Sequence, residues 1–197
     1  MKTLLAELKT SVLLTVVLAV LLCGAYPLAV WAGAQAFFPA KANGSLIVDR
    51  DGTVRGSALL AQSFISAKYF QPRPSAAGTG YDATSSSGTN LGPTSQKLAD
   101  SIKAAIAAYR TANRLAADTP VPADAVTSSG SGLDPHISVA NADIQARRVA
   151  STRGLALARV QALVAAHTEG RDLGVLGEPG VNVLLVNRDL DQLPSAR

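Results

Sequence analysis

The stretch TSSGSGLDPHIS, residues 127–138, concentrates several side chains that could do chemistry. Ser131, Asp134 and His136 are the residue types of a hydrolytic triad, in which a serine attacks, a histidine takes its proton and a carboxylate orients the histidine. These roles usually come from separate elements, whereas here they fall within six residues and lack the G-x-S-x-G turn that exposes a nucleophile. The pattern argues against a hydrolase, and we predict no catalytic residues.

A metal site is not predicted either. The sequence has two histidines, His136 and His167, which are far apart in the chain and lack neighbouring clusters of Cys or Glu. A zinc site needs three or four ligands at workable spacing. The histidines are therefore interpreted as a turn or interface residue and a helix-end residue, respectively.

Two Ser- and Gly-rich stretches are candidates for binding a phosphate. SSSGTNLGPTS (85–95) and SSGSGLDPHIS (128–138) each lead into a predicted helix, whose N-terminus favours an anion. Neither contains the G-x-x-x-x-G-K-[ST] pattern, and Asp134 would repel a phosphate. The alternative is a capped turn, in which Ser and Asp side chains accept hydrogen bonds from backbone amides.

The first of two long helices is predicted to begin after Pro93. Thr94 or Ser95 can accept an amide hydrogen bond as its N-cap, and its end is placed around Asn113. Apolar residues at helical spacing give it one buried stripe, namely Leu98, Ile102, Ile106 and Tyr109.

The second long helix is predicted over residues 138–167, capped by Ser138 or Asn141 and interrupted at Gly154. Its candidate buried positions are Ile144, Val149, Leu157, Val160 and Val164. The Val- and Leu-rich run Val181–Asn187 has the length of a strand and follows a turn-rich segment. It is predicted to be a central strand.

Nearer the N-terminus, strands at Leu46–Asp49 and Thr53–Arg55 are predicted to form a hairpin around the Asp51-Gly52 turn. Residues 69–94 are dominated by Pro, Ser, Gly and Thr and bury little apolar surface locally. This loop is therefore either mobile or held by a partner.

Residues 10–40 contain no Asp, Glu, Lys or Arg, and a helix of about 20 apolar residues crosses the hydrocarbon layer of a membrane. The apolar run Ser11–Trp31 is too long for a cleaved signal peptide, and Leu21 and Leu22 replace the small residues expected before a lipoprotein Cys23. We predict a tail at residues 1–9 and a retained transmembrane helix at residues 10–38.

Within this helix, Gly24 and Gly33 would permit close contact with another helix, and Pro27 would bend its outer end. The distribution of basic residues does not decide the orientation of this helix across the membrane, because Lys2 and Lys9 precede it while Lys41, Arg50 and Arg55 follow it.

The part after Ala40 carries 16 Lys and Arg against 13 Asp and Glu, a net charge of +3 spread along the chain. Such a surface is solvated and does not form a nucleic-acid footprint. The part after Ala40 also has no cysteine and thus no disulfide. The predicted fold is α+β: one transmembrane helix followed by a single mixed α/β domain, residues 41–197, with a small sheet and two long helices.

Taken together, seven stretches resemble the C subunit (KdpC) family of the Kdp potassium-transporting P-type ATPase, and they occur in the family's order over nearly the whole chain. They are ANGSLI (42–47), RGSALLAQSF (55–64), YFQPRPSA (69–76), SSGTNLGPTS (86–95), VTSSGSGLDPHIS (126–138), RVASTRGL (148–155) and PGVNVLLVNRDLD (179–191).

The resemblance implies an accessory, non-catalytic subunit of an ATP-driven complex that imports K⁺. Its partners would be a potassium-channel-like subunit, a P-type ATPase subunit and a very small fourth subunit. The chain lacks the D-K-T-G-T phosphorylation sequence of the ATPase subunit. The resemblance also places residues 1–9 in the cytoplasm and residues 41–197 outside it, with the single-pass helix in the plasma membrane.

The family is described as a catalytic chaperone that raises the ATP affinity of the ATPase subunit through a transient complex with nucleotide. ATP is therefore the one cofactor that the resemblance implies, and none is expected to be firmly bound. A domain outside the cytoplasm cannot meet cytoplasmic ATP, so assembly, stabilisation and tuning of ion access are the roles we favour.

We expect the two Ser- and Gly-rich loops to dock on a neighbouring subunit and to become ordered by binding. The expected docking residues are Asn90, Leu91, Gly92, Ser129, Ser131, Gly132, Leu133, Asp134 and His136. The alternative function is a membrane-anchored domain that binds a nucleotide or another anion, or that hydrolyses a substrate.

Overall fold

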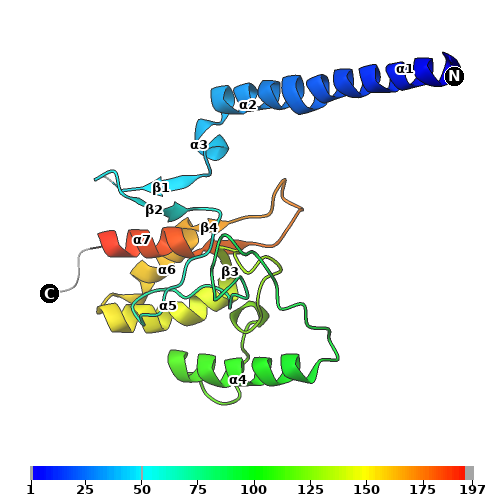
Figure 1. Ribbon diagram of the computed structural model, residues 1–197. Coiled ribbons are helices and arrows are strands. Elements are labelled where there is room, and N and C mark those ends of the chain that lie inside the picture. The colour runs from blue at the N-terminus through cyan, green and yellow to red at the C-terminus, as the bar shows by residue number, and fades with distance from the viewer. Residues whose placement is uncertain (1, 50, 194–197) are drawn as a thin grey trace. The chain divides into compact units, whose positions relative to one another are not determined.

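The structure is a computed structural model that describes residues 2–49 and 51–193 (Figure 1). Met1, at the start of the predicted tail, Arg50, and residues 194–197, at the end of the predicted domain, lie outside the described residues. The chain forms two compact units, one ending at Ser57 and one beginning at Ala58. Helices and small sheets occur together, which confirms the predicted α+β class.

The first unit begins with a long apolar helix composed of α1 (Lys2–Ala19), a π-helical turn η1 (Val20–Ala25) and α2 (Tyr26–Phe37). The 35 residues Thr3–Phe37 are long and apolar enough to cross a membrane, and no part of that stretch is packed inside the protein. Helical structure includes most of the predicted tail, because α1 already begins at Lys2.

The π-helical turn has a physical cause in Pro27. Proline has no N–H, and its ring clashes with the carbonyl four residues earlier, here that of Cys23. A π-helical turn immediately before Pro27 widens the helix, and the Tyr26 N–H donates to the Leu21 carbonyl, five residues back. The helix therefore continues past Pro27 to Phe37. Added methyl groups at Gly24 and Gly33 would meet nothing within 4 Å.

After the short helix α3 (Pro39–Ala42), the predicted hairpin is present as β1 (Leu46–Val48) and β2 (Val54–Ser57), paired antiparallel. At its turn, the Thr53 N–H donates to the Asp51 carboxylate over 3.0 Å. Gly52 has a φ of +82°, which explains why glycine suits this position.

The second unit contains a three-stranded antiparallel sheet in the order β3-β5-β4, formed by β3 (His136–Ser138), β4 (Thr168–Glu169) and β5 (Gly180–Asn182). A central strand is therefore present at Val181, but the prediction of a strand through Asn187 is wrong. Helix α7 (Val183–Gln192) begins there, because the Asn182 side chain accepts a hydrogen bond from the Leu185 N–H as N-cap.

The first predicted long helix is α4 (Gln96–Asn113), with Ser95 as the N-cap. The second is divided into α5 (Val139–Arg153) and α6 (Leu157–Ala166), which confirms the predicted interruption at Gly154. Gly154 ends α5 in the left-handed region, with a φ of +65°, where glycine is favoured. Ser138 caps α5 as predicted, and a short 3₁₀ turn, η2 (Ala123–Ala125), precedes β3.

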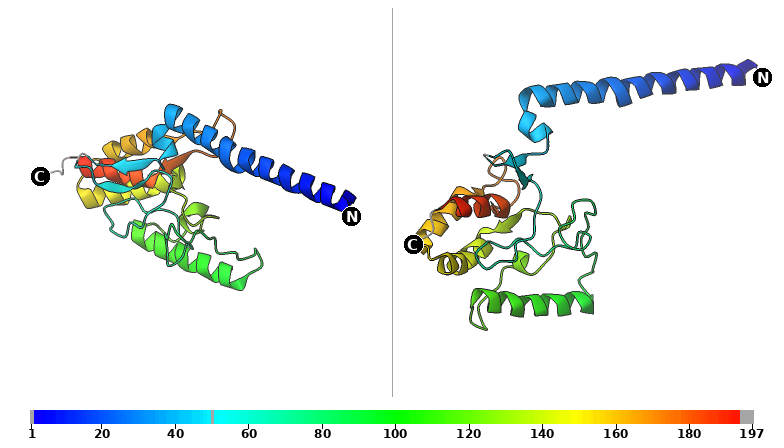
Figure 2. Two further views of the ribbon diagram at one scale, coloured as in Figure 1. Left: turned by 45° about the horizontal axis from the view of Figure 1, so that its top comes forward. Right: turned by 60° about the vertical axis from the view of Figure 1, so that its left-hand side comes forward.

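The core lies where α5, α6 and α7 pack against the sheet, and it includes Phe70, Ile137, Val149, Val160, Val164, Val181, Val186 and Leu190. Helix α4 is peripheral: in Figures 1 and 2, α5 lies between α4 and the pair α6 and α7. The stripe predicted on α4 is half-buried along its length. Polar contacts also attach it, since Tyr109 donates to the Asn141 side chain over 2.7 Å.

Candidate functional site

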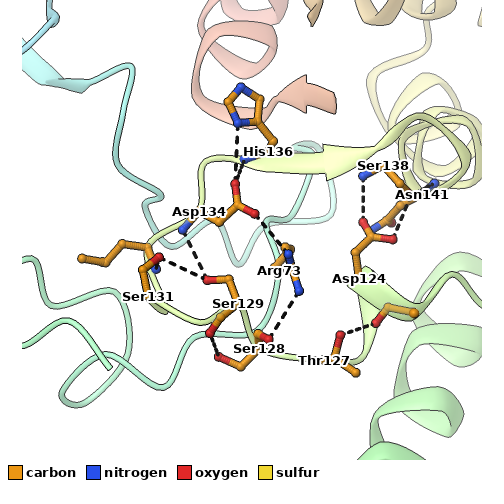
Figure 3. Close-up of polar contacts among 12 residues, drawn as sticks. Arg73, Asp124, Thr127, Ser128, Ser129, Ser131, Asp134, His136, Ser138 and Asn141 are labelled. Atoms are coloured by element: carbon orange, nitrogen blue, oxygen red, sulfur yellow. Dashed lines mark hydrogen bonds and ion pairs between the residues drawn. The ribbon is translucent and has the colours of Figure 1, made fainter. Parts of the chain in front are cut away.

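The loop that leads into β3 is organised around the Asp134 carboxylate (Figure 3). One oxygen accepts a hydrogen bond from the His136 backbone N–H at 2.9 Å, and the other forms an ion pair with Arg73 at 3.1 Å. The His136 ring lies between two carboxylates: its Nδ1 is 3.6 Å from Asp134, and its Nε2 is 3.3 Å from Glu169 on β4. Asp134 thus connects Arg73, the loop and the first strand of the sheet.

These charges set the protonation of the pair. Burial alone would raise the pKa of the Asp134 carboxyl, but the hydrogen bonds from His136 and Arg73 outweigh it and leave the pKa below its ordinary value. The interaction with Asp134 raises the pKa of His136, against the opposing effect of burial and with additional help from Glu169.

The three residues of the candidate triad are not arranged for catalysis. The Ser131 hydroxyl accepts a hydrogen bond from the Leu133 N–H at 3.1 Å and lies 3.5 Å from the Ser129 hydroxyl. Figure 3 shows Ser131 and His136 on opposite sides of Asp134. A serine nucleophile needs its base within hydrogen-bond reach, so the geometry supports the capped turn.

The N-terminus of α5 already holds an anion of its own, the Asp124 carboxylate of η2. Its oxygens accept hydrogen bonds from the Ser138 N–H and hydroxyl, both at 2.8 Å, and from the Asn141 side chain at 2.9 Å. This carboxylate occupies the position where a phosphate would bind. The phosphate interpretation of residues 128–138 is therefore not supported, and Asp124 is a residue that the sequence analysis missed.

The two Ser- and Gly-rich loops are brought together, through residues 86–88 and 130–132. The Ser87 N–H and the Ser86 hydroxyl both donate to the Ser131 carbonyl at 3.0 Å. A Cβ at Gly132 would lie 2.6 Å from the Ser87 carbonyl oxygen and 2.7 Å from the Ala77 nitrogen. Only glycine permits this approach, which fixes one loop against the other.

Asn90, Leu91 and Gly92 lie farther along the same loop, towards α4. Among the described residues, Asn90, Leu91 and Gly92 form no hydrogen bond with residues 129–136. Asn90 and Gly92 are exposed, and Asn90 has a φ of +54°. The structure therefore unites the Ser129–His136 part of the expected docking set and leaves residues 90–92 separate.

An open groove of about 660 Å³ runs along the united loops. Leu59 and Leu60 form an apolar side, with Leu59 61% exposed, while Arg73, Asp134, Ser129 and Ser131 form a polar side. Ser129, Gly132 and Leu133 are buried, so Ser131 and Gly130 are the loop residues that face solvent. Leu59, Leu60 and Arg73 were not predicted, because they come from segments that the sequence gives no reason to place here.

The preceding part of the long loop, residues 67–77, is held by its own domain. Arg148 on α5 donates to the carbonyls of Ala67 and Tyr69, and the Gln145 side chain pairs with the Gln71 backbone N–H and carbonyl. Phe70 is fully buried. Within residues 67–77, intramolecular contacts replace the partner that the composition suggested.

In the described part of the chain, no three His, Cys, Asp or Glu side chains are grouped so that they could hold a metal ion. His136 has the carboxylates of Asp134 and Glu169 as neighbours, whereas the His167 ring lies 2.9 Å from Asp189 on α7. The two histidines thus contact different carboxylates.

Comparison with known proteins gives the family. A family model described as K⁺-transporting ATPase, c chain (KdpC), matches residues 8–192. The chain is 56% identical to the potassium-transporting ATPase KdpC subunit of Mycobacterium tuberculosis over 168 residues, covering 85% of this chain and 88% of that protein. It is 55% identical to the protein of that name from Rhodospirillum rubrum over 188 residues, covering 95% and 96%.

A third relative, the KdpC subunit of a Caulobacter species, is 54% identical over 187 residues, which cover 95% of this chain and 94% of the relative. In each case the aligned region includes most of the chain. The chain therefore belongs to the KdpC family, the c chains of K⁺-transporting ATPases.

Proposed function

We propose that this chain is an accessory, non-catalytic subunit of an ATP-driven complex that imports K⁺. The observation that carries the proposal is the family match over residues 8–192, together with relatives that are named as subunits of potassium-transporting ATPases. The separation of Ser131 from His136 by Asp134 also favours a subunit without hydrolytic chemistry over the alternative of a hydrolytic domain.

The proposed partners are a potassium-channel-like subunit, a P-type ATPase subunit and a very small fourth subunit. The long apolar helix Thr3–Phe37 would anchor the chain in the plasma membrane with its N-terminus in the cytoplasm, and the domain would lie outside. Gly24 and Gly33 have open faces, and small residues of this kind allow two membrane helices to approach closely. They are the proposed helix contacts, beside the bend region at Pro27.

The groove lined by Leu59, Leu60, Arg73, Ser86 and residues 129–131 and 133–135 is the proposed docking surface. It combines exposed leucines with polar groups whose positions are fixed by hydrogen bonds, such as the 3.1 Å pair of Arg73 and Asp134. A surface that is already rigid loses little conformational entropy on binding, which favours stable assembly. Asn90, Leu91 and Gly92 would extend it towards α4.

The family role as a catalytic chaperone for ATP would, in this proposal, act through assembly. A carboxylate fills the N-terminus of α5, and the Ser- and Gly-rich loops hydrogen-bond to each other through their backbones. These features favour protein contact over direct binding of nucleotide. An effect on ATP affinity would therefore depend on docking of this subunit.

The test of docking is co-purification of the whole complex from membranes. Ser131→Trp would fill the groove, and Ala162→Trp, at an exposed site on α6, is the matched control. We expect S131W to lose the partner subunits and A162W to retain them, with equal far-ultraviolet circular dichroism. Equal recovery of partners with both variants would contradict a docking role for the groove.

Topology is tested with single cysteines in a Cys23→Ser background. Ser131→Cys and Ala162→Cys should both react with an impermeant maleimide on intact cells lacking the partner subunits. Reaction only after the cells are opened would place the domain in the cytoplasm and would restore nucleotide binding as the leading function.

A further inference from the structure

A cavity of about 500 Å³ lies between the C-terminal end of α4 and the outer side of α5, away from the Ser- and Gly-rich loops. Its polar lining consists of Asn113, Arg114, Thr119, Arg147, Arg148, Ser151 and Thr152. No Asp or Glu lines it. Three arginines thus line one recess whose lining contains no carboxylate.

Arg148 is the buried member of this group, with 9% of its surface exposed. Its guanidinium donates to the side chains of Asn113 and Gln145 and to the carbonyls of Ala67 and Tyr69. All of these acceptors are neutral, and a guanidinium remains protonated in proteins. Arg148 therefore has its hydrogen bonds satisfied, but its positive charge is not neutralised.

Arg114 and Arg147 are exposed. Among the residues that the structure describes, no carboxylate lies within ion-pair distance of Arg114, Arg147 or Arg148. The Asp118 side chain, which belongs to the turn after α4, is exposed and does not line the cavity. The two exposed guanidinium groups therefore remain available to a ligand.

Carbonyl oxygens at or beside the recess, which would repel an anion, already accept hydrogen bonds. Those of Arg110 and Thr111, at the end of α4, accept from the Arg114 backbone N–H, and that of Thr119 accepts from the Arg110 guanidinium. The Ser151 hydroxyl makes no hydrogen bond within residues 2–49 and 51–193, so it is free to donate. The Thr152 hydroxyl donates to the Arg148 carbonyl.

We propose that this recess binds a compact oxyanion with the chemistry of phosphate, held by Arg114 and Arg147 and by the Ser151 hydroxyl, next to the uncompensated charge of Arg148. Planar guanidinium groups pair with phosphate oxygens through parallel hydrogen bonds, which makes arginine well suited to this class of ligand. The phosphate belongs either to a lipid headgroup or to a free anion in solution.

The experiment is calorimetric titration of the full chain in an uncharged detergent with inorganic phosphate, at constant ionic strength set with chloride. Arg114→Gln and Arg147→Gln remove one cation each, and Arg159→Gln, at an exposed position on α6, removes the same charge elsewhere. We expect R114Q and R147Q each to weaken binding by about five- to tenfold. R159Q should bind as the unmodified chain does.

The source of the phosphate is distinguished by repeating the titration in nanodiscs. If phosphatidylglycerol weakens the binding of inorganic phosphate relative to phosphatidylcholine, the ligand is a lipid headgroup; if it has no effect, the ligand is a soluble anion. The proposal is overturned if the unmodified chain binds no phosphate in either setting, or if R159Q weakens binding as much as R147Q does. None of these results depends on assembly with partner subunits.

Discussion

Phe70 and Asn187 are 117 residues apart in the chain and are joined by two hydrogen bonds between the Asn187 side-chain amide and the Phe70 backbone. The Asn187 side-chain carbonyl accepts from the Phe70 N–H, and its amide donates to the Phe70 carbonyl, both at 2.8 Å. Asn187 is 1% exposed and Phe70 is fully buried. A single side chain from α7 thereby satisfies both backbone groups of a residue in an irregular segment, where a buried unpaired group would be costly.

The first prediction is that Asn187→Ala destabilises the domain by about 2–4 kcal/mol, because it leaves two buried backbone groups of Phe70 unpaired. The measurement is thermal unfolding of the full chain in mild detergent, followed by circular dichroism. Gln161→Ala, which removes an exposed amide on α6, should change stability by less than about 0.5 kcal/mol. Equal stability of the two variants would show that the pairing contributes little.

The same contact explains why the long loop was only partly predictable. Composition correctly indicates that residues 69–94 cannot bury much surface by themselves. The groups that hold the start of this loop, Gln145, Arg148 and Asn187, lie more than 70 residues away along the chain. A pattern confined to one segment contains no information about such partners, so mobility and docking were the natural hypotheses.

The incorrect prediction of a strand at residues 183–187, where α7 begins, has a local cause. Successive Val and Leu residues favour a strand, yet the buried positions Val183, Val186, Asn187 and Leu190 follow the i, i+3, i+4, i+7 spacing of a helix. The polar Asn187 concealed this spacing because it interrupts the apolar pattern. Helix caps were more reliable: Ser95 and Ser138 are both N-caps, as their position before an apolar stripe predicts.

The second prediction concerns Gly132→Ala. The backbone has a φ of +68°, and the new methyl group would lie 2.6 Å from the Ser87 carbonyl oxygen. Backbone strain and collision should together destabilise the domain by about 2–4 kcal/mol and separate the two loops. Gly130→Ala is the matched control, since its Cβ would meet nothing within 4 Å. A G132A variant as stable as G130A would mean that the loops adjust freely.

The third prediction is that Asp124→Ala lowers stability by about 1–3 kcal/mol, because three hydrogen bonds at the N-terminus of α5 are lost together with a favourable charge. Hydrogen exchange of the first turn of α5 should accelerate in D124A. Asp118→Ala removes an exposed carboxylate and serves as the control. Unchanged exchange in D124A would indicate that Ser138 caps the helix without assistance.

The last prediction is a pH dependence that comes from His136. Its interaction with Asp134 raises the pKa of His136 above the ordinary value of 6.5, so the protonated ring favours the folded state. The resulting stabilisation is complete below about pH 6 and is lost as the pH rises through the raised pKa. Asp134 has a lowered pKa and loses its own contribution to stability only in acid, so the range from pH 6 to 8 separates the effect of His136 from that of Asp134.

The effect should be below about 1 kcal/mol, because 32% of the His136 side chain is exposed and solvent screens its two carboxylate neighbours, Asp134 and Glu169. Unfolding temperatures of the full chain between pH 6 and 8 provide the measurement. His136→Gln should abolish the decline that the unmodified chain shows towards pH 8. Persistence of the decline in H136Q would assign it to other groups, and the ion pairs of His136 would then have no measurable influence on stability.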